Sequence, residues 1–251
     1  MKTLLTAVII AWFLPQQTNA WGRDGHKLIG KICDMHQNLT LVEPISSWAD
    51  EIKRYKKYQY TKTWHYTDSL DDPPHHCSIE SYEYNGGNNL LDKIQHFYNK
   101  STPLTEFEFK MFVHMYQDLY QPLHNVGKLR GGNSKKVRFF GSRTNLHTVW
   151  DTLLVKRRIR EFHTRDRYIR HLHTINVPLY DCHDFKKIAD YTNRINCKLV
   201  WVNKPESIKY EYYDAIKDTL DYLLVKSGKC LATLLKMNKA EYKESTTLAF
   251  V

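Results

Sequence analysis

Apolar residues in this chain recur at the spacing of an α-helix, and few stretches alternate with the two-residue period of a strand. Residues 25–36 are an example, because Leu28, Ile29 and Ile32 fall on one side of a helix. The same spacing predicts further helices at 88–99, 105–120, 145–175, 183–198, 205–226 and 228–240. A chain of 251 residues with this pattern is expected to form a mainly α, single-domain, multi-helix fold.

One segment, residues 125–143, interrupts the helical rhythm. It combines several glycines with Lys128, Arg130, Lys135 and other basic residues, between two predicted helices that carry histidines. This composition predicts a basic, glycine-rich loop or a short β-hairpin. Loops on a rigid scaffold often carry binding residues.

Residues 1–20 differ from the rest of the chain. A basic Lys2, an apolar run from Leu4 to Leu14, and small residues at Thr18 and Ala20 predict a secretory signal peptide. The mature domain is then expected to be 21–251, and the protein to be secreted or to reside in the lumen of the secretory pathway or vacuole. No later stretch is apolar enough to span a membrane, so stable membrane insertion is not expected.

Two further features agree with export. Asn38 and Asn99 begin glycosylation sequons. All five cysteines follow residue 20, and an oxidising compartment favours pairing them. The predicted pairs are Cys77–Cys230 and Cys182–Cys197, with Cys33 left as a buried thiol. Only the second pair rests on a sequence argument, which is its short spacing.

The formal net charge is +10, and aromatic residues make up 13% of the chain. A basic, aromatic-rich exported protein suits a polyanionic partner such as nucleic acid or a phospholipid surface. Lysine-rich faces that only keep the protein soluble account for the charge equally well.

Histidines and aspartates are spaced as metal ligands. His114 and Asp118 are four residues apart in one predicted helix, so both project from one face, and His147 and Asp151 repeat this spacing. His124 lies between the two pairs. A single pair is usually an ordinary surface pair, but two pairs flanking a third histidine predict a metal site that suits zinc.

Five motifs then resemble a known family. They are Trp-Gly-x-x-Gly-His from Trp21, Trp-Ala-Asp ending at Asp50, Trp-His-Tyr at 64–66, the block 114–124 and the block 145–151. In this order they resemble the zinc-dependent class I nucleases, which include fungal single-strand-specific nucleases and plant bifunctional nucleases. The resemblance covers residues 21–151 and continues more loosely through the C-terminal third.

The resemblance implies three zinc ions. The first is held by Asp50, His65, His114 and Asp118, and the second by His124, His147 and Asp151. The third is held by His26, by Asp118 as a bridge, and by the amino nitrogen and carbonyl oxygen of Trp21. An α-amino group can bind zinc only when it is free, so cleavage after Ala20 would complete this site.

The implied activity is that of a monomeric endonuclease and 3′-nucleotidase. It hydrolyses single-stranded RNA and DNA, and removes the phosphate of 3′-nucleotides, with 5′-phosphate products from the nucleic acids. Two ions sharing a carboxylate activate water and stabilise the leaving oxygen. By the same resemblance, Tyr66 stacks on a base, Asp68 hydrogen-bonds its edge and Asn133 contacts the substrate.

The chain departs from the family pattern near the first zinc. The usual arginine three residues after Asp50 is Lys53, which keeps the charge but not the bidentate geometry, and Arg54 follows it. Lys53 or Arg54 is therefore expected to stabilise the phosphate, with Asp50 completing the catalytic set.

Two alternatives remain open. A zinc phospholipase C has the same fold and ligand set, but typically carries glutamate where this chain has Asp151. A non-catalytic, secreted nucleic-acid-binding or zinc-binding protein would need only the basic surface. Asp151 and the complete ligand set favour the nuclease.

Overall fold

The computed structural model describes residues 21–67, 69–79, 88–202 and 206–242. The predicted signal peptide, residues 1–20, lies outside this part. The described chain is mainly helical, which confirms the expected fold class. Its α-helices are α1 Gly22–Gln37, α2 Val42–Ile45, α3 Trp48–Ile52, α4 Leu90–Tyr98, α5 Glu106–Asp118, α6 Leu146–Thr148, α7 Leu154–Glu161, α8 Arg165–Thr174, α9 Phe185–Ile195 and α10 Tyr210–Tyr242. Two 3₁₀ segments, η1 Lys56–His65 and η2 Pro122–Asn125, and two π segments, η3 Val149–Leu153 and η4 Asn196–Val200, complete the helical elements.

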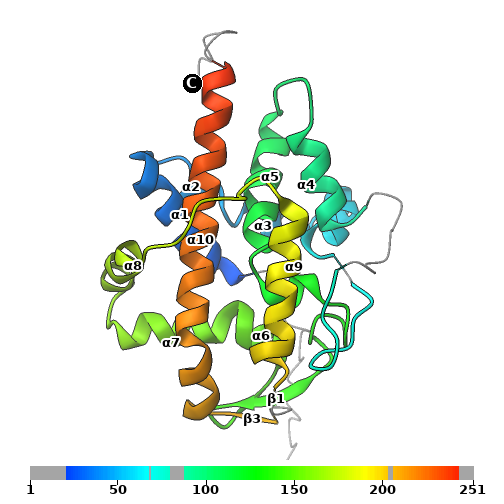
Figure 1. The fold of residues 1–251 in the computed structure, drawn as a ribbon, viewed down its shortest axis with the longest axis vertical. Helices are drawn as coiled ribbons and strands as arrows, with labels where there is room; N and C mark the ends of the chain where they lie inside the picture. Colours follow the sequence, from blue (N-terminus) through cyan, green and yellow to red (C-terminus); the bar gives the residue numbers. More distant parts are fainter. Residues whose placement is uncertain (1–20, 68, 80–87, 203–205, 243–251) are drawn as a thin grey trace, which may run out of the picture.

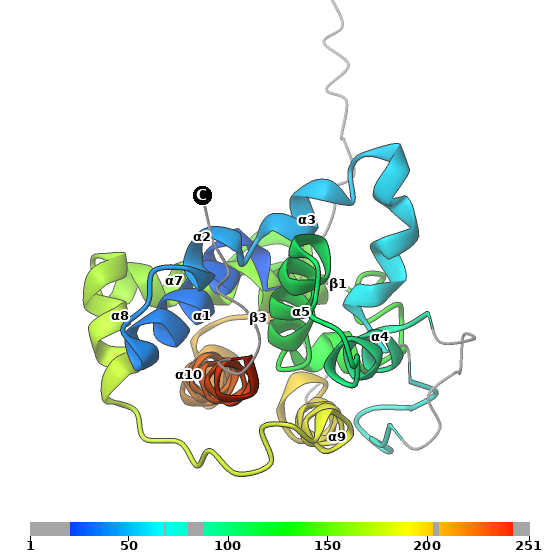
Figure 2. The same cartoon turned by 90° about the horizontal axis from the view of Figure 1, so that it is seen from above.

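Helix α10 runs along almost the whole length of the molecule, with α9 beside it (Figure 1). Helix α1 packs along α10, and the two approach closely at Gly228, where a Cβ would lie 2.8 Å from the carbonyl oxygen of Ile29. Figure 2 shows α1, α2, α3 and α5 gathered on one side of α10. Helices α1, α3 and α5 carry half of the eight candidate ligand side chains described below.

The helix boundaries differ from the sequence prediction in two places. The pattern at 145–175 is not one helix, because the chain turns at Phe162–Thr164, where His163 has φ +64° and the Thr164 side chain accepts from the Arg167 amide at 3.2 Å. Conversely, the helices predicted at 205–226 and 228–240 are one helix, α10. Gly228 does not end it, because this glycine serves the contact with α1.

Of the two forms predicted for the basic segment, a glycine-rich loop or a short hairpin, the structure has a short hairpin at its C-terminal end. Strand β1, Lys136–Phe139, pairs antiparallel with β2, Ser142–Asn145, and Phe140 and Gly141 turn the chain with positive φ angles. A two-residue turn of this kind matches the twist of the flanking strands. A short third strand, β3 Ser207–Ile208, adds parallel to β1.

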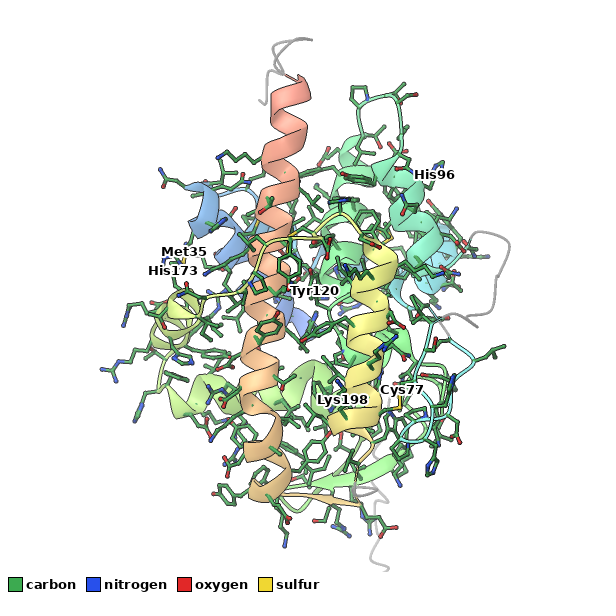
Figure 3. All side chains as sticks on the ribbon, viewed as in Figure 1. Met35, Cys77, His96, Tyr120, His173 and Lys198 are labelled. Carbon is green, nitrogen blue, oxygen red and sulfur yellow. A yellow bond between two sulfur atoms is a disulfide. The ribbon has the colours of Figure 1, made fainter. Side chains whose placement is uncertain are left out.

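The disulfides are Cys77–Cys197 and Cys182–Cys230, so the predicted pairing is wrong. Cys182 and Cys197 flank the 11-residue helix α9, which alone holds them about 16 Å apart. A disulfide requires Cα atoms within about 7 Å. Figure 3 shows Cys77 near Lys198, the neighbour of Cys197, at one end of α9. Cys33 is free and buried, as expected.

Among the described helices, none is both long and apolar enough to cross a membrane. Both sequon asparagines, Asn38 and Asn99, are exposed and follow directly after helices.

Candidate metal centre

Eight predicted ligand side chains converge in the interior from separate elements. They are His26 on α1, Asp50 on α3, His65 on η1, His114 and Asp118 on α5, His124 on η2, His147 on α6 and Asp151 on η3. All eight are buried. The α5 pair lies on one face, as its spacing predicted, and α5 begins with the predicted capping box between Thr105 and Glu108.

The side chains form three neighbouring groups whose donor atoms lie within 4.8 Å of one another. The groups are His26–His114–Asp118, Asp50–His65–His114 and His124–His147–Asp151. Asp118 lies where they meet. Its Oδ1 is 3.4 Å from His26 Nε2 and 3.7 Å from His124 Nδ1, and its Oδ2 is 3.1 Å from His65 Nδ1.

The donor set fits divalent metal ions. Several buried atoms that could bind a metal have no hydrogen-bond partner in the described structure: His26 Nε2, Asp50 Oδ2, Asp118 Oδ1 and His124 Nε2. Buried polar atoms without partners are costly. A cation at the centre of each group would satisfy them, and imidazole with carboxylate is a donor set that suits zinc.

Gln117 orients two of the histidines. Its Oε1 accepts from His26 Nδ1 at 2.6 Å, and its Nε2 donates to Ser46 Oγ at 3.0 Å. The Ser46 carbonyl in turn accepts from His114 Nδ1 at 2.8 Å. These bonds fix the tautomers, so that the Nε2 atoms of His26 and His114 face Asp118.

The glycine-rich loop orients a third histidine. The Gly131 carbonyl accepts from His147 Nδ1 at 2.6 Å, which leaves His147 Nε2 at 3.0 Å from Asp151 Oδ2. Gln121 Nε2 donates to Asp151 Oδ1 at 2.5 Å. Gly131 has φ +59°, and a Cβ there would lie 2.5 Å from the Leu123 carbonyl oxygen. Part of this loop therefore supports the centre.

The electrostatics of the centre also suit metal binding. Burial, reinforced by His114, lowers the pKa of His26 to about 4, so this imidazole is neutral with a lone pair to donate. Burial alone would raise the pKa of Asp50, but Lys53 and nearby histidines outweigh it and lower that pKa. Burial raises the pKa of Asp118 to about 7. A nearby positive charge would therefore favour the ionised form of Asp118.

A sequence model of the S1/P1 nuclease family matches residues 21–239. The chain belongs to the S1/P1 nuclease family. It is 29% identical to Nuclease S1 of Aspergillus oryzae over 61% of this chain and 60% of that protein. It is 31% identical to Nuclease P1 of Penicillium citrinum over 46% and 45% of the two chains, and 24% identical to Endonuclease 1 of Arabidopsis thaliana over 93% and 92%. The matches to Nuclease S1 and Nuclease P1 thus span less than two thirds of either relative.

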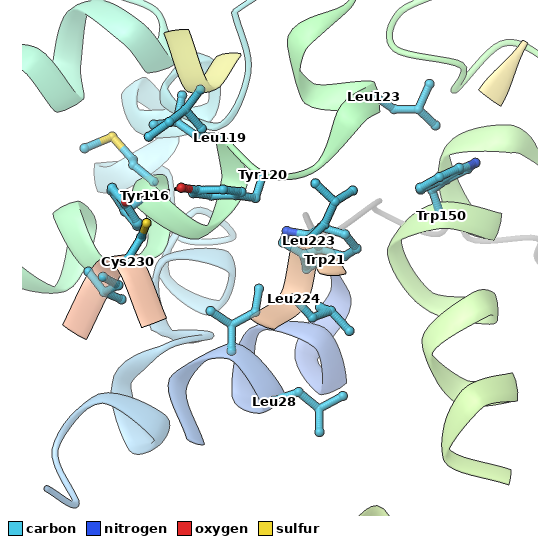
Figure 4. Close-up of a cluster of buried hydrophobic side chains, with 14 of the residues drawn as sticks. Trp21, Leu28, Tyr116, Leu119, Tyr120, Leu123, Trp150, Leu223, Leu224 and Cys230 are labelled. Carbon is cyan, nitrogen blue, oxygen red and sulfur yellow. Dashed lines mark hydrogen bonds between the residues drawn. The ribbon is translucent and has the colours of Figure 1, made fainter. Parts of the chain in front are cut away.

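In this member of the S1/P1 nuclease family, the motif that begins at Trp21 has a structural explanation. Trp21 is fully buried, and its indole Nε1 donates to the Gln117 carbonyl at 2.9 Å. Figure 4 shows its ring in the core near Leu223 and Leu224. Gly25 leaves room for it, since a Cβ at this glycine would lie 2.9 Å from the Trp21 Cβ. The motif thus fixes Trp21 at the start of the helix that carries His26.

The residues predicted to act on the phosphate lie beside the centre. Lys53 Nζ donates to Asp50 Oδ1 at 2.6 Å. Arg54 is exposed and lines a cavity of about 410 Å³ that reaches Asp50. The other residues lining this cavity are Arg23, Ser47, Glu51 and Tyr55.

The structure describes two of the three residues predicted to contact the substrate, Tyr66 and Asn133. Tyr66 directly follows His65 and its side chain is 38% exposed, so its ring is accessible. Asn133 donates from its side-chain amide to the Arg130 carbonyl at 2.9 Å, which helps to hold the loop in place. Asp68 lies outside the described residues.

Sequence reasoning missed the supporting residues Gln117, Gln121, Ser46 and Gly131. Gln117 and Gln121 lie inside the 114–124 block, yet nothing in the spacing shows which ligand each one contacts. Nothing near Ser46 in the sequence indicates its role, because its carbonyl accepts a hydrogen bond from His114, which is 68 positions away.

Proposed function

We propose that this protein is a zinc-dependent endonuclease and 3′-nucleotidase that hydrolyses single-stranded RNA and DNA to 5′-phosphate products. The observation that carries the proposal is the set of eight buried His and Asp side chains with unpartnered donor atoms. Membership of the S1/P1 nuclease family supports a nucleic acid as the substrate.

Three zinc ions are proposed as the cofactors. The first ion is assigned to Asp50, His65, His114 and Asp118, the second to His124, His147 and Asp151, and the third to His26, Asp118 and the main-chain amino and carbonyl groups of Trp21. When bound, the ions supply activated water and stabilise negative charge on the phosphate oxygens.

The chain's own residues place and hold the substrate. Lys53 keeps Asp50 ionised and adds positive charge where the phosphate is expected. Arg54, in the adjoining cavity, supplies a second cationic contact. Tyr66 is 38% exposed and offers a stacking surface for a base, and a base must leave its own duplex stack to present its face to the ring. This requirement is the basis for the proposed preference for single strands.

Export and processing belong to the same proposal. Two disulfides are typical of an oxidising compartment, which agrees with a secreted protein. Cleavage between Ala20 and Trp21 would free the α-amino group that binds the third ion. Processing is therefore proposed as a step in forming the active site.

The test uses purified mature protein with its zinc content measured. Activity is assayed on single-stranded DNA, single-stranded RNA and 3′-AMP, and the new ends are identified. Asp118→Asn is the inactive comparison, because it weakens the carboxylate at the junction of the groups. A folded, zinc-loaded protein that cleaves none of these substrates would overturn the proposal. Release of diacylglycerol from phosphatidylcholine would identify a phospholipase C instead.

A further inference from the structure

The segment Lys53–Tyr66 has an unusual composition. Its 14 residues include five Lys or Arg, five Tyr or Trp, and no Asp or Glu. It directly links two residues of the metal centre, since Asp50 precedes it closely and His65 lies within it. We call it the basic aromatic segment. In Figure 2 its ribbon extends away from the helices, beyond α3 and α5.

Some aromatic rings of this segment anchor it. Tyr58 stacks on Phe107 with ring centroids 5.8 Å apart. Trp64 is only 8% exposed, and its indole donates to Asn88 Oδ1 at 2.7 Å. The segment is therefore fixed to the body of the molecule at two points.

Other rings of the segment face solvent. Tyr55 is 63% exposed and Tyr60 is 55% exposed, although each is large and mostly apolar. Tyr60 is also braced by an edge contact with Trp64, with centroids 5.4 Å apart. Because the ring of Tyr60 is already held in place, little side-chain conformational entropy is lost when a partner stacks on its exposed face.

Lys53 pairs with Asp50, but three other cations of the segment have no acidic partner in the described structure. Arg54, Lys56 and Lys62 are exposed, and none forms an ion pair with any residue in the described parts of the chain. Elsewhere, basic side chains such as Lys110 and Arg194 pair with carboxylates. The positive field of the segment therefore remains available to a partner.

The segment is continuous with the metal centre. Arg54 and Tyr55 line the cavity of about 410 Å³ that reaches Asp50, and Arg23 adds another cation there. Arg23, like Arg54, has no ion pair within the described structure. A chain bound at the centre can therefore pass through this cavity onto the exposed tyrosines.

We propose that the basic aromatic segment binds the part of a single strand that extends beyond the cleaved bond. Tyr55 and Tyr60 stack on its bases, while Arg23, Arg54 and Lys56 contact its phosphates. Base stacking combined with a cationic groove is the usual mode of sequence-independent single-strand binding. A phospholipid surface is less suitable, because such surfaces favour Trp, Phe and Leu on the apolar face.

This proposal rests on the proposed function and extends it from the cleaved bond to the rest of the substrate. The test uses zinc-loaded mature protein and thymidine oligonucleotides of 2 and 12 residues, with phosphorothioate linkages to slow hydrolysis. Fluorescence anisotropy measures the dissociation constants of wild type, Tyr55→Ala, Tyr60→Ala and the double variant. Tyr180→Ala is the matched control, since Tyr180 is 68% exposed outside the segment.

Each tyrosine variant is expected to weaken binding of the 12-mer by about fivefold or more. The 2-mer and the control are expected to bind as in wild type, with zinc content and melting temperature unchanged. In a second arm, Arg23→Ala/Lys56→Ala is expected to reduce the slope of log affinity against log salt by about 1.4, or 0.7 for each lost phosphate contact.

Wild-type affinity of the double tyrosine variant for the 12-mer would overturn the proposal. Intact 12-mer binding with lost binding to phosphatidylserine vesicles would assign the segment to a membrane surface instead. The two proposals can fail separately. Wild type that binds the 12-mer through these tyrosines but cleaves nothing would refute only the proposed function.

Discussion

Gln117 is the residue whose removal should most clearly separate support of the metal centre from metal ligation itself. Gln117→Leu keeps most of the side-chain volume but removes the acceptor for His26 Nδ1 and the donor to Ser46 Oγ. Both partners are fully buried, so water cannot easily replace the lost bonds. His26 is then free to rotate or change tautomer.

The expected loss can be worked from these contacts. Losing the hydrogen bond that orients a metal-bound histidine typically weakens metal affinity about 10- to 100-fold, equivalent to about 1.4–2.8 kcal/mol. The affinity of the proposed third ion, held through His26, should fall by that amount, and that of the proposed first ion, whose His114 is oriented through Ser46, should fall less. Two unsatisfied buried groups should also lower the free energy of unfolding by about 1–3 kcal/mol each.

The assay is zinc competition against a chelator of known affinity, with total zinc and thermal unfolding measured in parallel. Gln117→Glu keeps the acceptor oxygen and should restore much of the zinc affinity, which separates hydrogen bonding from packing. Gln95→Leu, at an exposed position of α4, is the control for the leucine itself. Three zinc ions bound to Gln117→Leu with wild-type affinity would refute the reasoning.

Four further results are expected. Gly131→Ala should lower zinc content and melting temperature, because its Cβ would clash with the Leu123 carbonyl oxygen at 2.5 Å. The control is Gly141→Ala, which also has a positive φ but faces open space and should change zinc content little. One extra residue before Trp21 should lower kcat/KM by orders of magnitude with circular dichroism unchanged, and full activity would exclude the N-terminal ligand. Hydrolysis of long single-stranded DNA should fall steeply between 50 and 200 mM salt, whereas that of 3′-AMP should not. Burial raises the pKa of Cys33 to about 12, so thiol reagents at pH 8 should label no cysteine in the folded protein and one after denaturation without reductant.

The sequence correctly predicted the features that depend on residues close together in the chain, such as helices and their ends. The helical spacing identified most helices, and the capping box located the start of α5 correctly. The four-residue spacing placed His114 and Asp118 on one face, and the family motifs identified the remaining residues that the fold brings together.

Local sequence patterns could not predict contacts between segments that lie far apart in the chain. Short spacing wrongly favoured Cys182–Cys197, because the intervening residues form a rigid helix rather than a flexible loop. Gly228 reads as a break in a helical pattern, but α1 packs against it. The hydrogen bond between Gln117 and His26 joins residues 91 positions apart, and only the folded chain shows it.

The burial of Trp21 also bears on the proposed export and cleavage after Ala20, because Trp21 would then be the terminal residue of the exported protein. An aminopeptidase must draw the terminal residue into its own site, yet here that residue has a fully buried side chain and an indole hydrogen bond. Removing it would require pulling a large aromatic ring out of the core. The same packing that places Trp21 beside the centre would therefore make the processed end resistant to stepwise trimming, so that the N-terminus stays where processing left it.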